Sequence, residues 1–139
     1  MDENEKREII LEHYQNPINR GLIDDESYLK SNTSNDSCID EINLMVKIED
    51  DVLKDIKFDG EACAICTSAT SIMIETLLGK KVEEVKEILL NYSNMIEGKE
   101  YNKDILENAN VYSDISKQPN RKKCALLPWW GIEKILKQL

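Results

Sequence analysis

The sequence lacks the features that direct a chain to a membrane, to nucleic acid or to the secretory route. No apolar run is long enough to span a bilayer, and the N-terminal MDENEKREII is acidic and amphipathic rather than an apolar secretion signal. Basic residues are outnumbered, 18 against 27 acidic ones, so the net charge of −9 would repel a phosphate backbone. We therefore expect a cytoplasmic protein that binds neither membrane nor nucleic acid.

Histidine and cysteine are scarce, with one and four residues respectively. Cytoplasmic thiols are kept reduced, so metal ligation or thiol chemistry is a better expectation for these cysteines than a disulfide framework. The 139 residues show no internal repeat and no linker, and their length is usual for one folding unit. We therefore expect a single domain over residues 1–139.

Apolar residues at helical spacing predict several helices. Long helices are expected at residues 5–14, 63–78 and 82–96. A short helix is expected around residues 105–109, within a polar connection over 101–118, and Cys124 is expected to open a further helical turn. The stretch after Pro128 also has helical spacing and is expected to pack back on the hairpin over residues 42–58.

Alternation of apolar and polar residues predicts two strands, at residues 42–48 and 52–58, with a turn at 49–51. Together they form an antiparallel hairpin. The preceding residues 21–36 are rich in serine, asparagine and aspartate, which predicts a long loop.

Three cysteines and one aspartate fall at the predicted boundaries between these elements. Cys38 and Asp40 lead into the first strand, where side chains two residues apart point the same way. Cys63 opens the helix that follows the second strand, and Cys124 lies near the C-terminus. Three thiolates and one carboxylate suit zinc in tetrahedral geometry. The helix dipole at Cys63 and the basic residues 121–123 would offset the negative charge of these ligands.

Four motifs give the chain a resemblance to a known family. They are HYQNPINRG at residues 13–21, CID at 38–40, GEAC at 60–63 and RKKC at 121–124. Through them the chain resembles the IscU/NifU-like iron–sulfur cluster assembly family, and within it the SufU branch. That branch is favoured because the segment between Cys63 and Cys124 is long, Lys123 stands where IscU proteins have histidine, and an LPPVK motif is missing.

The resemblance implies an α+β fold in which a small antiparallel sheet of about three strands packs against several helices, as in IscU and SufE. It implies zinc bound by Cys38, Asp40, Cys63 and Cys124. It also implies that the protein accepts sulfur from a SufS-type cysteine desulfurase and passes it to a SufBCD-type scaffold. Cys38 is then the persulfide acceptor, freed from zinc when a histidine of the docked desulfurase replaces it.

The chain departs from the family's motifs at three positions. Ile39 replaces the glycine of C-G-D and Ala62 replaces the last glycine of G-x-G-C, so the backbone beside two of the ligands has less freedom. Cys66 is an additional cysteine one helical turn beyond Cys63. It is expected to pack in the core, with a competing metal ligand or a second sulfur acceptor as alternatives.

Three other functions stay open from the sequence. Cys63 and Cys66 form a C-x-x-C pair at the start of a helix, where thioredoxin-like redox pairs lie, although no βαβ pattern surrounds them. A purely structural zinc module and an iron–sulfur cluster scaffold are the remaining alternatives. His13 is expected to be structural or to face a partner rather than to bind metal, and Asp36 to be a turn residue.

Overall fold

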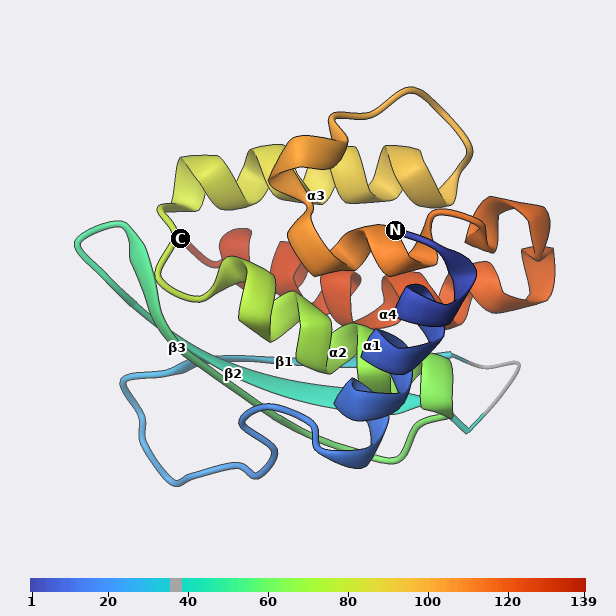
Figure 1. The fold of residues 1–139 in the computed structure, drawn as a ribbon. Helices are drawn as coiled ribbons and strands as arrows, with labels where there is room; N and C mark the ends of the chain where they lie inside the picture. The colour runs from blue at the N-terminus through green and yellow to red at the C-terminus, as the bar shows by residue number, and fades with distance from the viewer. Residues whose placement is uncertain (36–38) are drawn as a thin grey trace.

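A three-stranded antiparallel sheet carries the larger helices on one face in the computed structural model, which describes residues 1–35 and 39–139 (Figure 1). The strands follow the order β1-β2-β3 across the sheet. Their bounds are β1 Leu29–Ser34, β2 Glu41–Glu49 and β3 Val52–Asp59. This arrangement confirms the expected α+β fold.

The β2–β3 hairpin lies where the alternating pattern predicted it. Asp50 and Asp51 connect the strands, and both have positive φ angles, 52° and 64°. Two consecutive residues in that region are typical of the tight turns whose twist matches that of paired strands. The predicted turn at residues 49–51 is therefore confirmed.

The prediction of a continuous loop over residues 21–36 is wrong for β1. This strand pairs with β2 from Leu29 opposite Val46 to Ser34 opposite Glu41. Only Thr33 of the six β1 residues is buried, so the strand has no apolar alternation that a sequence pattern would detect. Pairing with β2, rather than the propensity of these residues, makes the segment a strand.

Within residues 1–35 and 39–139, four α-helices and three short 3₁₀ helices accompany the sheet. Their bounds are α1 Glu3–Gln15, α2 Ala64–Leu77, α3 Val82–Ile96, η1 Lys103–Ile105, η2 Glu107–Tyr112, η3 Ile115–Lys117 and α4 Pro119–Leu136. Helix α4 begins well before Pro128 and passes through it, so the helical turn expected at Cys124 and the helix expected after Pro128 are one element. Among the described residues, no helix has the length and apolar character needed to cross a bilayer.

Helix α2 is the centre of the core. Almost all of its residues are buried, and the hydroxyl groups of Thr70 and Thr76 donate to carbonyl oxygens four residues earlier. Helices α2 and α4 lie on the sheet, and α3 lies beyond them (Figure 1). Tyr92 of α3 stacks on Trp129 of α4 with 4.0 Å between ring centroids. The C-terminal helix packs on β1 and β2. The expected packing on the hairpin is thus confirmed for its first strand, β2, and contact with β1 was not expected.

Gly131 allows α4 to lie close to the sheet. A Cβ atom at this position would lie 2.7 Å from Leu44 Cδ1 and 3.2 Å from both Ser31 Oγ and Thr33 Oγ1. Leu44 is 1% exposed, so its side chain lies within the core and would have to shift among packed neighbours. The absence of a side chain at position 131 is therefore a packing requirement.

Replacement of Gly131 by alanine is expected to lower the free energy of unfolding by about 1–2 kcal/mol, because overpacking outweighs the better helix propensity of alanine. Urea denaturation followed by circular dichroism measures this change. The exposed Glu133→Ala in the same helix is the control and is expected to change stability little. A G131A protein at least as stable as the wild type would contradict the close packing of α4 on β1 and β2.

Candidate metal centre

Asp40, Cys63 and Cys124 come together at one end of the sheet. One ligand atom from each residue lies within 4.8 Å of the other two. Asp40 immediately precedes β2, Cys63 is the N-cap of α2, and Cys124 lies in the second turn of α4. Residues far apart in the sequence therefore bring two sulfur donors and one carboxylate to a single point.

Asp40 fixes the start of α2 against the sheet. Its side chain is buried, with 1% of the residue exposed. Asp40 Oδ1 accepts a hydrogen bond of 2.7 Å from the Cys63 backbone N–H, and Asp40 Oδ2 lies 3.6 Å from Cys63 Sγ. The Asp40 carbonyl also accepts a hydrogen bond from the Asn35 N–H at 3.1 Å. The carboxylate is thus held in place by the backbone around it.

Cys63 presents its thiol at an exposed helix N-terminus. Its Sγ accepts a hydrogen bond from the Cys66 backbone N–H at 3.4 Å, which makes the side chain the cap of α2. The N-terminal end of a helix carries partial positive charge, which stabilises a thiolate. Cys63 therefore presents an exposed sulfur at the start of α2, where a thiolate ligand to a cation would be favoured by the helix N-terminus.

Cys124 is half-buried beside the other two donors. Burial raises the pKa of the Cys124 thiol well above its usual value, and hydrogen bonding and charge from Cys63 and Asp40 raise it further. Three donors that become anionic at such close range repel one another unless a cation lies among them. Two thiolates and a carboxylate are ligands that zinc binds, so this donor set fits a zinc ion.

Pro128 follows Cys124 by one helical turn. Because proline has no backbone N–H, it cannot donate the helix hydrogen bond to the Cys124 carbonyl that any other residue would donate. Pro119, by contrast, lies at the first position of α4, where its missing N–H costs nothing. The Cys124 carbonyl therefore lacks the helix hydrogen bond from position 128, while the carbonyl of the next residue, Ala125, accepts one from the Tyr92 hydroxyl at 2.7 Å.

The remaining residues singled out in the sequence lie elsewhere or outside the described residues. Cys38 and Asp36 belong to the undescribed segment 36–38. Cys66 is fully buried in the hydrophobic core and is not part of the donor group found in the described parts of the chain. His13 is buried between α1 and α2, with Nδ1 2.7 Å from Ser71 Oγ and Nε2 3.3 Å from a Glu75 oxygen. These contacts agree with a structural role for His13.

Two features of the site's surroundings were not foreseen. Ile39 is 80% exposed, so beside Asp40 it contributes an apolar surface as well as a stiffer backbone. Gly60 has φ +144°, and a Cβ atom there would clash with the carbonyl oxygen of Glu41. In the sequence, the place of Gly60 at the start of the GEAC motif is the signal that indicates this requirement for glycine.

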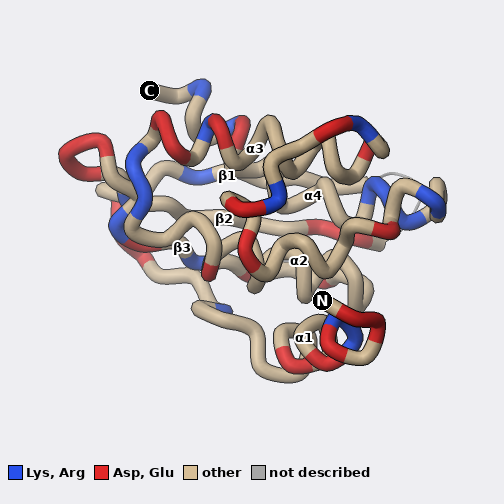
Figure 2. Tube along the Cα trace, turned by 45° about the horizontal axis from the view of Figure 1, so that its top comes forward, with Lys and Arg blue, Asp and Glu red and all other residues tan. Residues whose placement is uncertain are grey.

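The basic residues 121–123 lie at the start of α4 (Figure 2), where Lys122 pairs with Glu97 at 3.6 Å.

Sequence comparison relates the chain to known proteins. The NifU-like N terminal domain matches residues 5–125. The chain is 37% identical over 129 residues to the zinc-dependent sulfurtransferase SufU of Bacillus subtilis, covering 92% of this chain and 86% of that protein. It is 36% identical over 132 residues to the iron–sulfur cluster assembly scaffold protein IscU of Thermotoga maritima, covering 95% and 92%.

Solved structures show similarity to the same group of proteins. A putative iron–sulfur cluster assembly scaffold protein for the SUF system, from Fervidobacterium islandicum, superposes with a TM-score of 0.88 at 34% identity, covering 93% of this chain and 94% of that one. The N-terminal part of a NifU-like protein from Brucella abortus has a TM-score of 0.82 at 17% identity, which shows a shared fold. The chain therefore belongs to the NifU-like N-terminal domain family, whose SufU and IscU members it resembles along most of its length.

Proposed function

We propose that this protein is a zinc-containing sulfur carrier that accepts persulfide sulfur from a SufS-type cysteine desulfurase and passes it to SufBCD-type assembly machinery. The observation that carries the proposal is the convergence of Asp40, Cys63 and Cys124 within 4.8 Å. The similarity to a protein named as a zinc-dependent sulfurtransferase supports it. Cys38, two residues before Asp40, is the proposed fourth ligand.

Cys38 is the residue that we propose to carry sulfur. Its thiolate attacks the outer sulfur of the persulfide on the desulfurase. A new S–S bond forms on Cys38, the S–S bond of the donor breaks, and the donor cysteine leaves as a thiolate. Asp40, Cys63 and Cys124 would remain the ligands of the zinc ion during this exchange. Bound zinc lowers the pKa of a coordinated thiol and protects it, without redox chemistry of its own.

An iron–sulfur cluster scaffold is the second candidate function. The Thermotoga relative is named as a scaffold, and the same donor residues suit iron as well as zinc. Anaerobic reconstitution with iron and sulfide distinguishes the two. A stable coloured cluster on the wild-type protein would support a scaffold, whereas a sulfur carrier is expected to retain zinc and form no stable cluster.

Mass spectrometry of Cys38 tests the sulfur-carrier proposal directly. After incubation with a SufS-type desulfurase and cysteine, the alkylated Cys38 peptide is expected to carry one additional sulfur atom. Cys38→Ser is expected to abolish this labelling, because the accepting thiolate is gone.

Cys66→Ser is the matched control. It changes a buried cysteine that lies outside the donor group and is expected to preserve both zinc and the label on Cys38. Wild-type Cys38 without label would indicate a locked structural zinc site. Loss of a disulfide reductase activity in C66S, with Cys38 unlabelled in wild type, would favour the redox alternative.

A further inference from the structure

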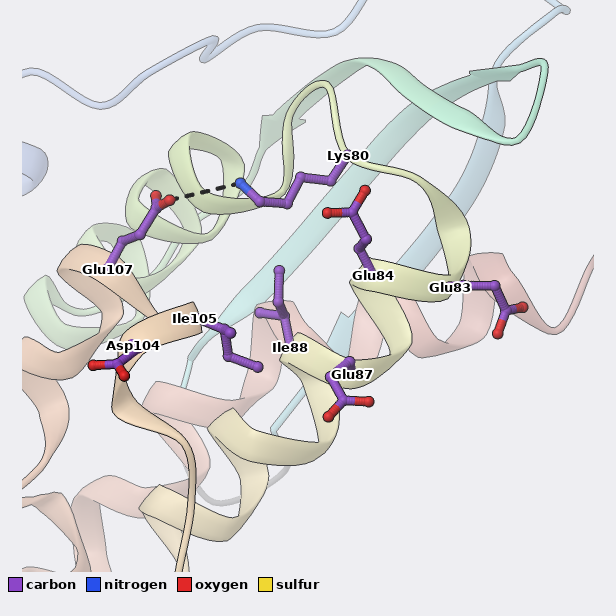
Figure 3. Close-up of a pocket in the computed structure, with 8 residues that line it drawn as sticks. All are labelled: Lys80, Glu83, Glu84, Glu87, Ile88, Asp104, Ile105 and Glu107. Carbon is purple, nitrogen blue, oxygen red and sulfur yellow. Dashed lines mark ion pairs between the residues drawn. The ribbon is translucent and has the colours of Figure 1, made fainter.

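A groove with an apolar floor and acidic walls lies at the end of α2 remote from the metal centre. It has a volume of about 520 Å³ and is formed by α3 and the η1–η2 segment (Figure 3). Helix α2 has 14 residues, so its two ends lie roughly 20 Å apart. Cys63 caps one end and Lys80 follows the other. A molecule bound in this groove would therefore leave the metal centre uncovered.

The floor of the groove consists of two isoleucines. Ile88 from α3 and Ile105 from η1 face each other between the two walls (Figure 3). Ile88 is buried and Ile105 is half-buried. The floor thus offers contact to an aliphatic side chain.

The walls carry five carboxylates and one ammonium group. They are Glu83, Glu84 and Glu87 on α3, Asp104 and Glu107 on the opposite wall, and Lys80. Three of these carboxylates already have partners. Glu107 pairs with Lys80 at 3.7 Å, Glu84 accepts from the Lys81 N–H at 3.3 Å, and Glu83, which points away from the floor (Figure 3), pairs with Lys86 at 3.3 Å. Lys80 Nζ also donates to the Thr76 carbonyl at 2.9 Å. Charge of one sign on both sides of an apolar cleft concentrates a field that attracts cations. The groove is therefore complementary to a basic ligand.

Hydrogen bonds hold the two walls in position. The Asn91 side chain of α3 accepts from the Asn102 N–H at 2.7 Å and donates to the Glu87 carbonyl at 2.9 Å. Asn110 donates to the carbonyl groups of Lys103 and Glu107 at 2.8 and 2.9 Å. A groove formed in advance loses little conformational entropy when a ligand binds.

From these features we infer that the groove binds a lysine- and arginine-rich segment of a partner protein that carries an aliphatic residue. The basic side chains pair first with Glu87 on α3 and Asp104 on η1, whose carboxylates make no ion pair among the described residues, and the aliphatic side chain packs on Ile88 and Ile105. A small cation would use the carboxylates without the floor. Because the groove and the metal centre lie at opposite ends of α2, the protein is able to bind this partner while another occupies the metal centre.

Titration of the ¹⁵N-labelled full-length protein with the synthetic peptide Gly-Lys-Lys-Leu-Lys-Lys-Gly tests the inference by NMR. Amide shifts are expected in the first half of α3 and around residues 102–107. The double substitution E87Q/D104N is expected to weaken binding roughly fivefold, as the loss of two exposed ion pairs predicts. Replacing the leucine of the peptide by glycine is expected to weaken binding by a similar factor, since apolar contact is lost.

The matched control is D24N/E26Q, which removes two exposed negative charges from the loop before β1. This loop lies on the opposite side of the sheet from α3 (Figure 1). Equal weakening by D24N/E26Q, or equal affinity of the leucine-free peptide, would show general electrostatic attraction and overturn the inference. Zinc-loaded and zinc-free protein are expected to bind the peptide equally, so the result is independent of the sulfur-carrier proposal.

Discussion

Replacing Asp40 by alanine is expected to remove zinc from the protein and to abolish its stimulation of a cysteine desulfurase. The substitution deletes a proposed ligand, and it also leaves the Cys63 N–H without its 2.7 Å acceptor. The wild-type protein is expected to contain about one zinc per chain, as a mononuclear four-ligand site requires. Zinc affinity should fall by about 100-fold or more, because even the groups that only orient metal ligands contribute up to that factor. Metal analysis and a coupled desulfurase assay measure the two effects.

Asp40→Asn separates ligation from the structural role of the side chain. Asparagine keeps an oxygen that accepts the Cys63 N–H but loses the negative charge that binds a cation. We therefore expect a folded protein with weakened zinc binding. Asp24→Asn, an exposed change outside the site, is the control and should retain full zinc. A wild-type protein that purifies without metal and does not stimulate the desulfurase would rule out the proposed zinc centre.

Replacing Gly60 by alanine is expected to produce the largest loss of stability. The new Cβ atom would meet the Glu41 carbonyl oxygen and lie 3.0 Å from its carbonyl carbon, with the backbone at φ +144°. A clash with main-chain atoms is relieved only by moving the strand ends, so we expect a loss of about 3 kcal/mol or more. Cys63 follows three residues later, and zinc affinity is expected to fall as well. Thermal and urea unfolding measure the loss of stability.

Gly21→Ala is the matched comparison for that effect. Gly21 also has a positive φ, +119°, but a Cβ atom there would meet nothing within 4 Å. Its replacement carries the cost of the backbone conformation alone, about 1 kcal/mol. Similar losses for G60A and G21A would mean that the contact between Gly60 and Glu41 is not the source of the effect.

The hairpin and the main helices were predictable because their apolar residues repeat with the period of the element. Strand β1 was not, since its one buried residue, Thr33, gives no period to detect. Its existence depends on pairing with β2, which is a long-range contact. Helix α4 was divided at Pro128 for a similar reason. Burial of Trp129 and the residues that follow holds the helix together despite the proline, and sequence alone does not reveal that packing.

Asp40, Cys63 and Cys124, three of the four ligands that sequence motifs suggested, converge in the structure, while the fourth, Cys38, lies outside the described residues. The ligand set stays a prediction. Cys66 packs in the core, as expected, but the sequence left its alternatives open. A residue one helical turn beyond Cys63 faces either the metal centre or the core, depending on how neighbouring segments pack on α2. In the structure those segments enclose it completely. Likewise, the exposure of Ile39 depends on the surrounding chain and not on its own apolar character.

Tyr92 has a consequence for the metal centre that follows from its two contacts with α4. Its ring stacks on Trp129, after Pro128, and its hydroxyl donates to the Ala125 carbonyl at 2.7 Å, before the proline. Helix α4 has one hydrogen bond fewer at Pro128, yet one side chain of α3 holds both sides of that point. Ala125 is the neighbour of Cys124, so the position of this proposed ligand is set by the packing of α3 on α4.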